Sequence, residues 1–135
     1  MTDQTPPAGP KAAFTIRPAV PEDVGTIANL IRELAIYEKL DQHARATPDD
    51  FRRHLFGNRP YAEVLLAEID GEPVGIALFF HTFSTFRGQP GIYLEDLFVQ
   101  PEYRGQGIGK ALLGSLAKIA MERKCGRLEW AVLNW

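Results

Sequence analysis

The sequence has 135 residues, of which 45% are hydrophobic and 24% are charged. This length fits one domain, and this balance excludes wholesale disorder. A net charge of −2 excludes a protein that mainly coats nucleic acid, which needs clustered positive charge, and no apolar run approaches the roughly 20 residues that span a bilayer. The one cysteine, Cys125, allows no internal disulfide. We therefore expect a cytoplasmic protein without nucleic-acid or membrane partners.

The amino-terminal part of the chain is predicted to form a strand and two helices after a leader. Residues 1–13 contain three prolines and little to bury, which indicates a flexible leader. Residues 14–17 alternate apolar and polar side chains, as a half-buried strand does. Residues 22–40 carry apolar side chains at helical spacing, and a second helix is expected to begin at the N-cap Thr47 and to end at Gly57.

The remaining part of the chain has mostly strand-like patterns. Asp70–Gly71 is a hairpin signal, although Glu72–Pro73 leaves a longer loop open. The last strand, helix and strand should form a right-handed parallel crossover, and the strands before them can be antiparallel. The sequence thus predicts an α/β (α+β) fold, a mixed, mostly antiparallel sheet flanked by helices. The expected elements are strands over 63–69, 74–83 and 92–99, a loop over 84–91, a helix over 108–123 and a strand over 127–133.

The turn between the third apolar strand and the helix is rich in glycine, with Gly105, Gly107 and Gly109 at alternate positions. Glycine lets the backbone approach a ligand closely, and the start of a helix adds partial positive charge. Together these features predict an anion site suited to a pyrophosphate. A turn without a ligand is the alternative, but three glycines destabilise a helix start unless something needs the space.

Two common phosphate motifs do not fit this turn. The dinucleotide fingerprint fails because Lys110 occupies the place of its third glycine when counting starts at Gly105. The nucleotide P-loop fails because only three residues separate Gly105 from Gly109, and Ala111 replaces the hydroxyl residue. The pattern that fits is Arg104-x-x-Gly-x-Gly.

The segment from Tyr93 to Lys110 resembles the acetyl-CoA motif of the GNAT superfamily of N-acetyltransferases. Residues 14–19, 33–38 and 130–135 resemble the diamine acetyltransferases within it, which act on spermidine, spermine or thialysine. The resemblance implies that residues 14–135 form an acetyl-CoA-dependent N-acetyltransferase domain of the GNAT fold, with two strands that splay around the thioester. It implies contacts to acetyl-CoA by Leu97, Phe98, Val99, Arg104, Gly105, Gln106, Gly107, Ile108, Gly109 and Lys110.

Two adjacent carboxylates, Glu95 and Asp96, stand in the third apolar strand, where neighbouring side chains point to opposite faces. An alkyl ammonium must lose a proton before it attacks a thioester, and a burial-shifted carboxylate can take up that proton. The resemblance assigns this catalytic role, and contact with the acceptor, to Glu95. For Asp96 a structural ion pair is an equal alternative.

The resemblance also implies an acceptor site formed by Tyr37, Glu38, Glu129, Trp130 and Ala131. The alternatives are an ordinary helix end for the first two and a solvated strand face for the others. Ser84 stands where the polyamine enzymes have an acidic residue, which favours shorter diamines, thialysine-like amino acids or another small amine over spermidine and spermine. The three histidines and Cys125 lack metal-ligand spacing, so we expect no metal.

The chain stops at Trp135, whereas the relatives continue with a helix that carries the tyrosine taken to protonate the CoA thiolate. We therefore expect a domain that is incomplete at its carboxyl end and lacks the last helix and strands. An unpaired edge at 127–133 predicts self-association, beyond the homodimer usual in the family.

The leading hypothesis is an enzyme that moves an acetyl group from acetyl-CoA to a primary amine of a small molecule by direct attack in a ternary complex. One alternative is a non-catalytic acyl-CoA-binding module, which the missing tyrosine favours. Another is a protein or peptide N-acetyltransferase with the same cofactor site. A nucleotide-binding regulator fits the motif least well.

Overall fold

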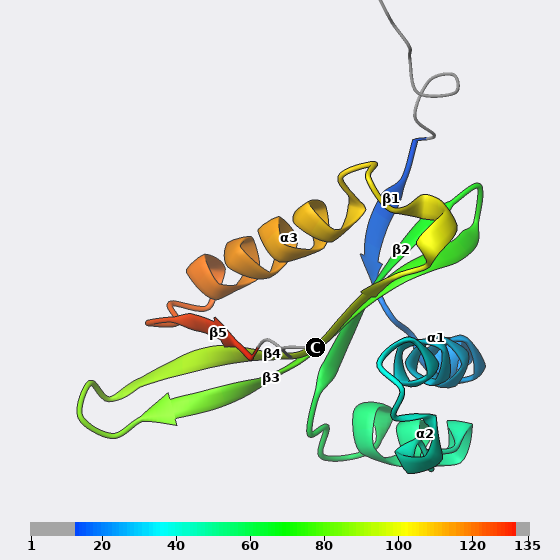
Figure 1. The fold of residues 1–135 in the computed structure, drawn as a ribbon. Helices are drawn as coiled ribbons and strands as arrows, with labels where there is room; N and C mark the ends of the chain where they lie inside the picture. Colours follow the sequence, from blue (N-terminus) through cyan, green and yellow to red (C-terminus); the bar gives the residue numbers. More distant parts are fainter. Residues whose placement is uncertain (1–12, 132–135) are drawn as a thin grey trace, which may run out of the picture.

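The computed structural model describes residues 13–131 (Figure 1). The predicted leader, apart from its last residue, and residues 132–135 lie outside this range. None of the helices in the described part combines the length and apolar character needed to cross a membrane. The elements are β1 (Thr15–Pro18), η1 (Pro21–Asp23), α1 (Val24–Tyr37), η2 (Asp41–His43), α2 (Pro48–Phe56), β2 (Glu63–Ile69), β3 (Glu72–Ser84), β4 (Gln89–Val99), η3 (Pro101–Tyr103), α3 (Ile108–Glu122) and β5 (Leu128–Trp130).

The strands form one five-stranded sheet in the order β1-β2-β3-β4-β5. The first three pairings are antiparallel, and only β4 and β5 run parallel, joined by α3 as the crossover helix. This arrangement confirms the predicted mixed, mostly antiparallel sheet. β5 pairs with β4 over three residues only, and its last pair joins Leu94 to Trp130.

The helices cover both faces of the sheet (Figure 1). α3 packs on one face through an apolar stripe that includes Ile108, Leu112 and Leu116. α1 and α2 cover the other face, where Ile27 and Leu30 are almost completely buried. The period of apolar residues in α1 and α3 explains both layers, because one stripe of each helix faces the sheet.

Several boundaries differ from the sequence-based expectations. The first helix is shorter than 22–40, because it opens with a 3-10 turn and ends at Tyr37. The turn at Asp70 and Gly71 is tight, since Ile69 pairs directly with Glu72 and both turn residues have positive φ angles. β3 and β4 extend into the expected loop, leaving only residues 85–88 between them. β5 begins at Leu128, one residue later than expected, and residues 132–133 of the expected strand lie outside the described range.

A β-bulge interrupts β4 at Glu95. On β3 the neighbours Leu78 and Phe79 pair with Asp96 and Leu94, so Glu95 is an extra residue without an opposite partner. The bulge exchanges the two faces of the strand: Leu94 packs in the core beneath α3, whereas Phe98 packs in the core beneath α1. The expected regular alternation through Glu95 and Asp96 is therefore wrong.

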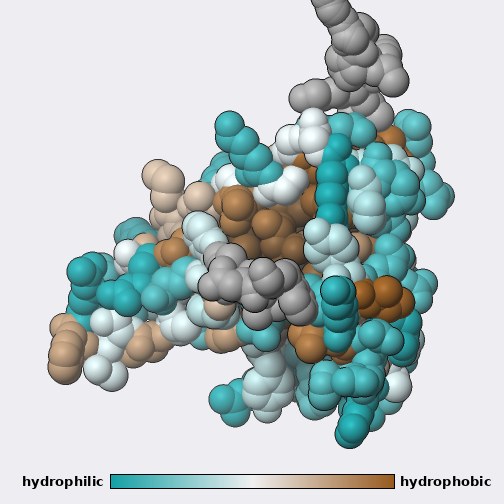
Figure 2. Space-filling model, in the orientation of Figure 1, coloured by the Kyte–Doolittle hydropathy of each residue, from teal (hydrophilic) through white to brown (hydrophobic). Residues whose placement is uncertain are grey.

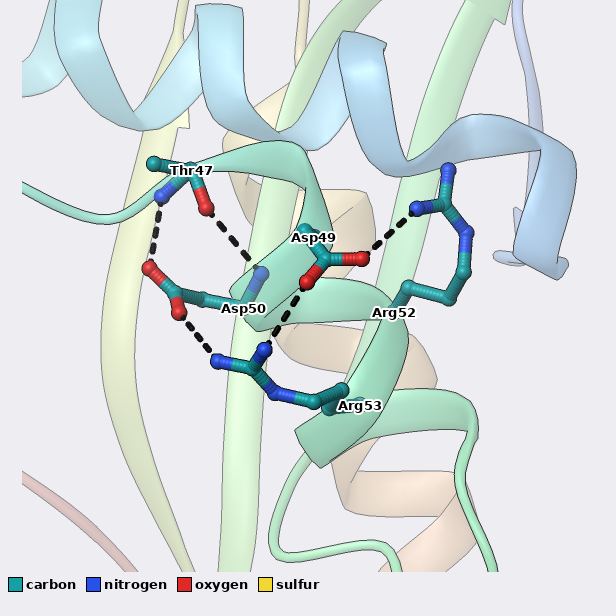
Figure 3. Close-up of polar contacts among 5 residues, drawn as sticks. All are labelled: Thr47, Asp49, Asp50, Arg52 and Arg53. Carbon is teal, nitrogen blue, oxygen red and sulfur yellow. Dashed lines mark hydrogen bonds and ion pairs between the residues drawn. The ribbon is translucent and has the colours of Figure 1, made fainter.

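α2 begins as predicted with Thr47 as its N-cap (Figure 3). The backbone amide of Asp50 donates to Thr47 Oγ1 at 3.2 Å, and the amide of Thr47 donates to the Asp50 carboxylate at 2.9 Å. Asp49 accepts from Arg52 and Arg53 on the next turn, at 3.1 and 2.8 Å. These reciprocal contacts fix the start of the helix on an exposed surface.

Candidate functional site

The glycine turn leads from the end of β4 into α3. Gly105 and Gly107 have φ angles of +78° and +87°, a region that side chains other than glycine rarely adopt. A Cβ atom added at either position would meet no heavy atom within 4 Å, so the space around the turn is open. The glycines are therefore needed for the backbone path, and the path leaves room for a ligand.

The backbone amides of this turn have no acceptor in the part of the chain that the structure describes. Within residues 13–131, no carbonyl accepts from the six amides between Gly105 and Lys110, and the first helical bond runs from the Ala111 amide to Gly107 O at 3.0 Å. The backbone-to-side-chain bonds of this part of the chain begin at other amides. Free N–H groups at a helix start carry partial positive charge, so these residues fit the diphosphate that the resemblance implies.

A cavity of about 450 Å³ lies against this turn, and we call it the turn cavity. The end of β4, the last turn of α1 and the glycine turn form its walls. Most of the residues predicted to contact acetyl-CoA line it, but Gln106 does not, and its Oε1 atom is buried without a hydrogen-bond partner. The lining residues are Leu34, Tyr37, Glu38, Leu97, Phe98, Val99, Tyr103, Arg104, Gly105, Gly107, Ile108, Gly109 and Lys110.

A second cavity, of about 550 Å³, opens where β4 and β5 stop pairing, and we call it the bulge cavity. It shares Leu34, Glu38 and Leu97 with the turn cavity, so the two are adjacent. Figure 2 shows hydrophobic residues gathered in the middle of this face, beside α3. The remaining lining residues are Leu40, Tyr93, Leu94, Glu95, Asp96, Leu113, Trp130 and Ala131.

The two carboxylates of β4 have different surroundings. Glu95 is exposed at the bulge, whereas Asp96 is half-buried on the side of the sheet that α1 covers. Burial raises the pKa of Asp96 to about 6, and the negative charges of Glu95 and Glu38 add to this effect. Asp96 is thus a burial-shifted carboxylate of the site.

The sequence-based prediction of site residues does not include Asp96. The adjacent acidic pair in an apolar strand is a signal that the sequence offers, but the bulge that buries Asp96 is not visible in the sequence. The expected acceptor residues also separate: Glu38, Trp130 and Ala131 line the bulge cavity, and Tyr37 lines the turn cavity.

Glu129, the remaining residue of the predicted acceptor site, lies apart from these residues. It lines another cavity, together with residues of the β3–β4 hairpin, and its carboxylate is 3.6 Å from Arg127 Nη1. It is not among the residues that line the bulge cavity.

Residues 13–131 contain no group of three or more histidine, cysteine, aspartate or glutamate side chains that could hold a metal ion. His81 Nε2 lies 3.3 Å from Arg123 Nη1, which also donates to the Glu63 carboxylate. The residues that line the two cavities offer backbone amides, carboxylates, aromatic rings and the cations Arg104 and Lys110.

Comparison with known proteins agrees with this geometry. Residues 27–135 match the model of the Acetyltransferase (GNAT) family. A thialysine N-epsilon-acetyltransferase of Bos taurus is 44% identical over 92% of this chain and 77% of its own length. An L-ornithine N5-acetyltransferase of Arabidopsis thaliana is 29% identical over 98% of this chain and 78% of its own length.

A solved structure shows the same fold. The ribosomal-protein-alanine N-acetyltransferase of Brucella melitensis biovar Abortus 2308 is 30% identical, with a TM-score of 0.76 over 90% of this chain and 82% of that chain. Family model, curated relative and solved structure thus agree on the family. The chain belongs to the GNAT family of acetyltransferases and is an acetyl-transferring enzyme.

Proposed function

We propose that the protein transfers an acetyl group from acetyl-CoA to a primary amine of a small molecule, a diamine, a polyamine or a lysine-like amino acid, by direct attack in a ternary complex. The observation that carries this proposal is the adjacency of the two cavities. Five of the six residues whose amides find no partner among residues 13–131 line one, three carboxylates line the other, and Glu38 borders both.

The turn cavity is the proposed site of the cofactor. The amides from Gly105 to Lys110 would hold the diphosphate, and the strand edge from Leu97 to Val99 would lie along the pantetheine arm. Within the described chain this edge has no strand beside it, since the last β4–β5 pair is at Leu94. When bound, acetyl-CoA supplies an acetyl group activated as a thioester.

The bulge cavity is the proposed site of the amine. Glu38, Glu95 and Asp96 give it negative charge, and its lining contains no lysine or arginine. We propose that exposed Glu95 contacts the incoming ammonium and takes up its proton. Asp96, whose pKa lies near 6, is a second candidate for the proton, since a base that titrates near neutral pH is suited to this task.

The class of acceptor is supported by the relatives. Their names place the acetyl group on the N-epsilon of thialysine and on the N5 of L-ornithine in those proteins. A peptide acceptor is the second candidate, favoured by the name of the ribosomal-protein-alanine enzyme. Both candidates use the same turn cavity, so the acceptor alone separates them.

The test is an assay of thiol release from acetyl-CoA with diamines, lysine analogues and peptides as acceptors. We expect release with small amines, a large loss in Glu95→Gln and little change in Glu129→Gln. The second variant is a matched control, because Glu129 lines a different cavity. CoA binding without thiol release for any acceptor would contradict the enzymatic proposal and favour an acyl-CoA-binding module.

We also propose that copies of the chain associate through the edge of β5, in a reducing, cytoplasmic compartment. Within residues 13–131 no strand pairs with the outer side of β5, and Trp130 on it is 50% exposed. Unpaired strand edges favour pairing with another chain. A monomer at high concentration by light scattering would contradict this association.

A further inference from the structure

The side chain of Arg104 folds back over the turn cavity. Its Nε donates to Val99 O at 2.9 Å, at the end of β4. Its guanidinium carbon lies 4.3 Å from the centre of the Tyr37 ring and 5.6 Å from that of Phe98. Arg104 thereby connects the start of the glycine turn with the last turn of α1 and with the exposed edge of β4.

We infer that Arg104 is a latch at the turn cavity, which holds its guanidinium against Tyr37 and its Nε on Val99 O until a diphosphate draws it away. The inference rests on the proposed function, because it needs a CoA-type ligand in this cavity. It adds a positioning role for Tyr37, which acts through Arg104 and not on the reacting atoms.

Arg104 and a pantetheine arm would compete for the carbonyl oxygen of Val99. A pantetheine arm along Leu97 to Val99 needs the polar groups of this strand edge, and Arg104 Nε already occupies Val99 O. The folded arginine therefore takes one of the two acceptor positions of this carbonyl oxygen and competes with the arm for it.

The negative charge of a diphosphate would draw the Arg104 guanidinium away from Tyr37. Arg104 lines the same cavity as the glycines of the turn and Lys110. A diphosphate held by these amides offers a bidentate partner for arginine, which is stronger than a single bond to a carbonyl and a contact with an exposed ring. A ligand without phosphate offers no such replacement and has to break the latch unaided.

The Tyr37 side chain has few contacts besides the one with Arg104. The ring is 57% exposed at the end of α1, and its centre lies 6.5 Å from that of Phe98. No hydrogen bond of its side chain occurs among residues 13–131. Its contact with the guanidinium is therefore the main interaction that a substitution at this position removes.

The test compares two probes, CoA and pantetheine, whose binding is measured by calorimetry or by NMR titration. Pantetheine lacks the diphosphate. We expect Arg104→Ala to tighten pantetheine binding about fivefold and to weaken CoA binding about tenfold, because the same change opens the latch and removes a phosphate partner. Tyr37→Leu should tighten the binding of both probes by about two- to fivefold.

A matched control is available at Arg59, whose guanidinium carbon lies 5.6 Å from the ring of Tyr61, outside the turn cavity. Arg59→Ala should change the affinity of neither probe. Unchanged pantetheine binding in Arg104→Ala would overturn the latch and leave Arg104 as a phosphate ligand only. Weaker binding of both probes in Tyr37→Leu would also overturn it. If the wild-type protein binds neither probe, the proposed function fails together with the latch.

Discussion

The two cavities on β4 are built in different ways. The turn cavity depends on the backbone: glycines at 105 and 107 set its path, and the groups proposed to bind the ligand are main-chain amides. The bulge cavity depends on side chains from several elements, with Glu38 from the end of α1 and the acidic pair from the bulge of β4. The turn of the turn cavity is formed by residues close together in the sequence. The bulge cavity, in contrast, forms only when the sheet and α1 have packed together.

The largest effect is expected from the bulge cavity. Glu95→Gln should lower kcat/KM by about 10²-fold or more, because the amide cannot take up the proton of the ammonium. CoA affinity should stay within about twofold, since Glu95 does not line the turn cavity. Equal losses in Glu95→Gln and in the control Glu129→Gln would show that the effect is not specific to the bulge cavity.

The next effect concerns the turn cavity. Gly107→Ala should weaken CoA binding by more than about tenfold, because the strained residue moves the amides that hold the diphosphate. Gly71→Ala is a matched control: its φ angle of +80° is close to the +87° of Gly107, and a Cβ at Gly71 also meets nothing within 4 Å.

Both glycine variants should lose about 1 to 2 kcal/mol of folding free energy, which denaturant unfolding can measure. Only Gly107→Ala should lose affinity for CoA in calorimetry. A similar loss of affinity in Gly71→Ala would mean that general destabilisation, and not the turn, weakens binding.

The third effect separates function from stability at Asp96. Its raised pKa means that the folded protein binds the proton more tightly than the unfolded chain, so stability falls as pH rises from about 4 through about 6. Asp96→Asn should therefore raise the free energy of unfolding above pH 6 by about 1 to 2 kcal/mol, allowing for partial exposure. The gain should vanish near pH 4.

Activity should respond in the opposite direction if Asp96 accepts the proton. The wild-type rate should then rise with pH through about 6, and Asp96→Asn should remove this acid limb. A stabilised variant with an unchanged pH profile would leave Glu95 as the only proton acceptor of the pair.

The smallest effect lies away from both cavities. Thr47→Ala removes the side-chain oxygen that accepts from the Asp50 amide, and it should cost about 1 kcal/mol of folding free energy. The affinity for CoA and the rate of transfer should not change. A loss of CoA affinity would show that α2 influences the turn cavity, against the separation described above.

The sequence predicts the turn cavity better than the bulge cavity for physical reasons. Arg104 and the glycines lie within six residues of the sequence. The backbone conformation of the turn depends on these residues alone, so their places in the cavity can be predicted. The folded conformation of Arg104 could not, because it depends on Tyr37 from α1, far away in the chain. The order of the elements was accessible because hydrophobic periodicity is a local property.

The bulge escaped prediction because it is a property of pairing. Nothing in the residues around Glu95 indicates that Leu78 and Phe79 on β3 skip one residue of β4. This single insertion decides that Asp96 faces α1 and becomes buried. Glu129 illustrates the same limit, because similarity to a motif predicts contact with the acceptor, whereas in the structure Glu129 lines another cavity.

The most direct test of the account is an NMR titration of the ¹⁵N-labelled protein with CoA, following the amide signals of residues 105–110. The account predicts that these six amides show the largest shifts in the described chain, and that inorganic diphosphate moves the same signals. Shifts confined to other parts of the protein, with residues 105–110 unmoved at saturating CoA, would contradict it.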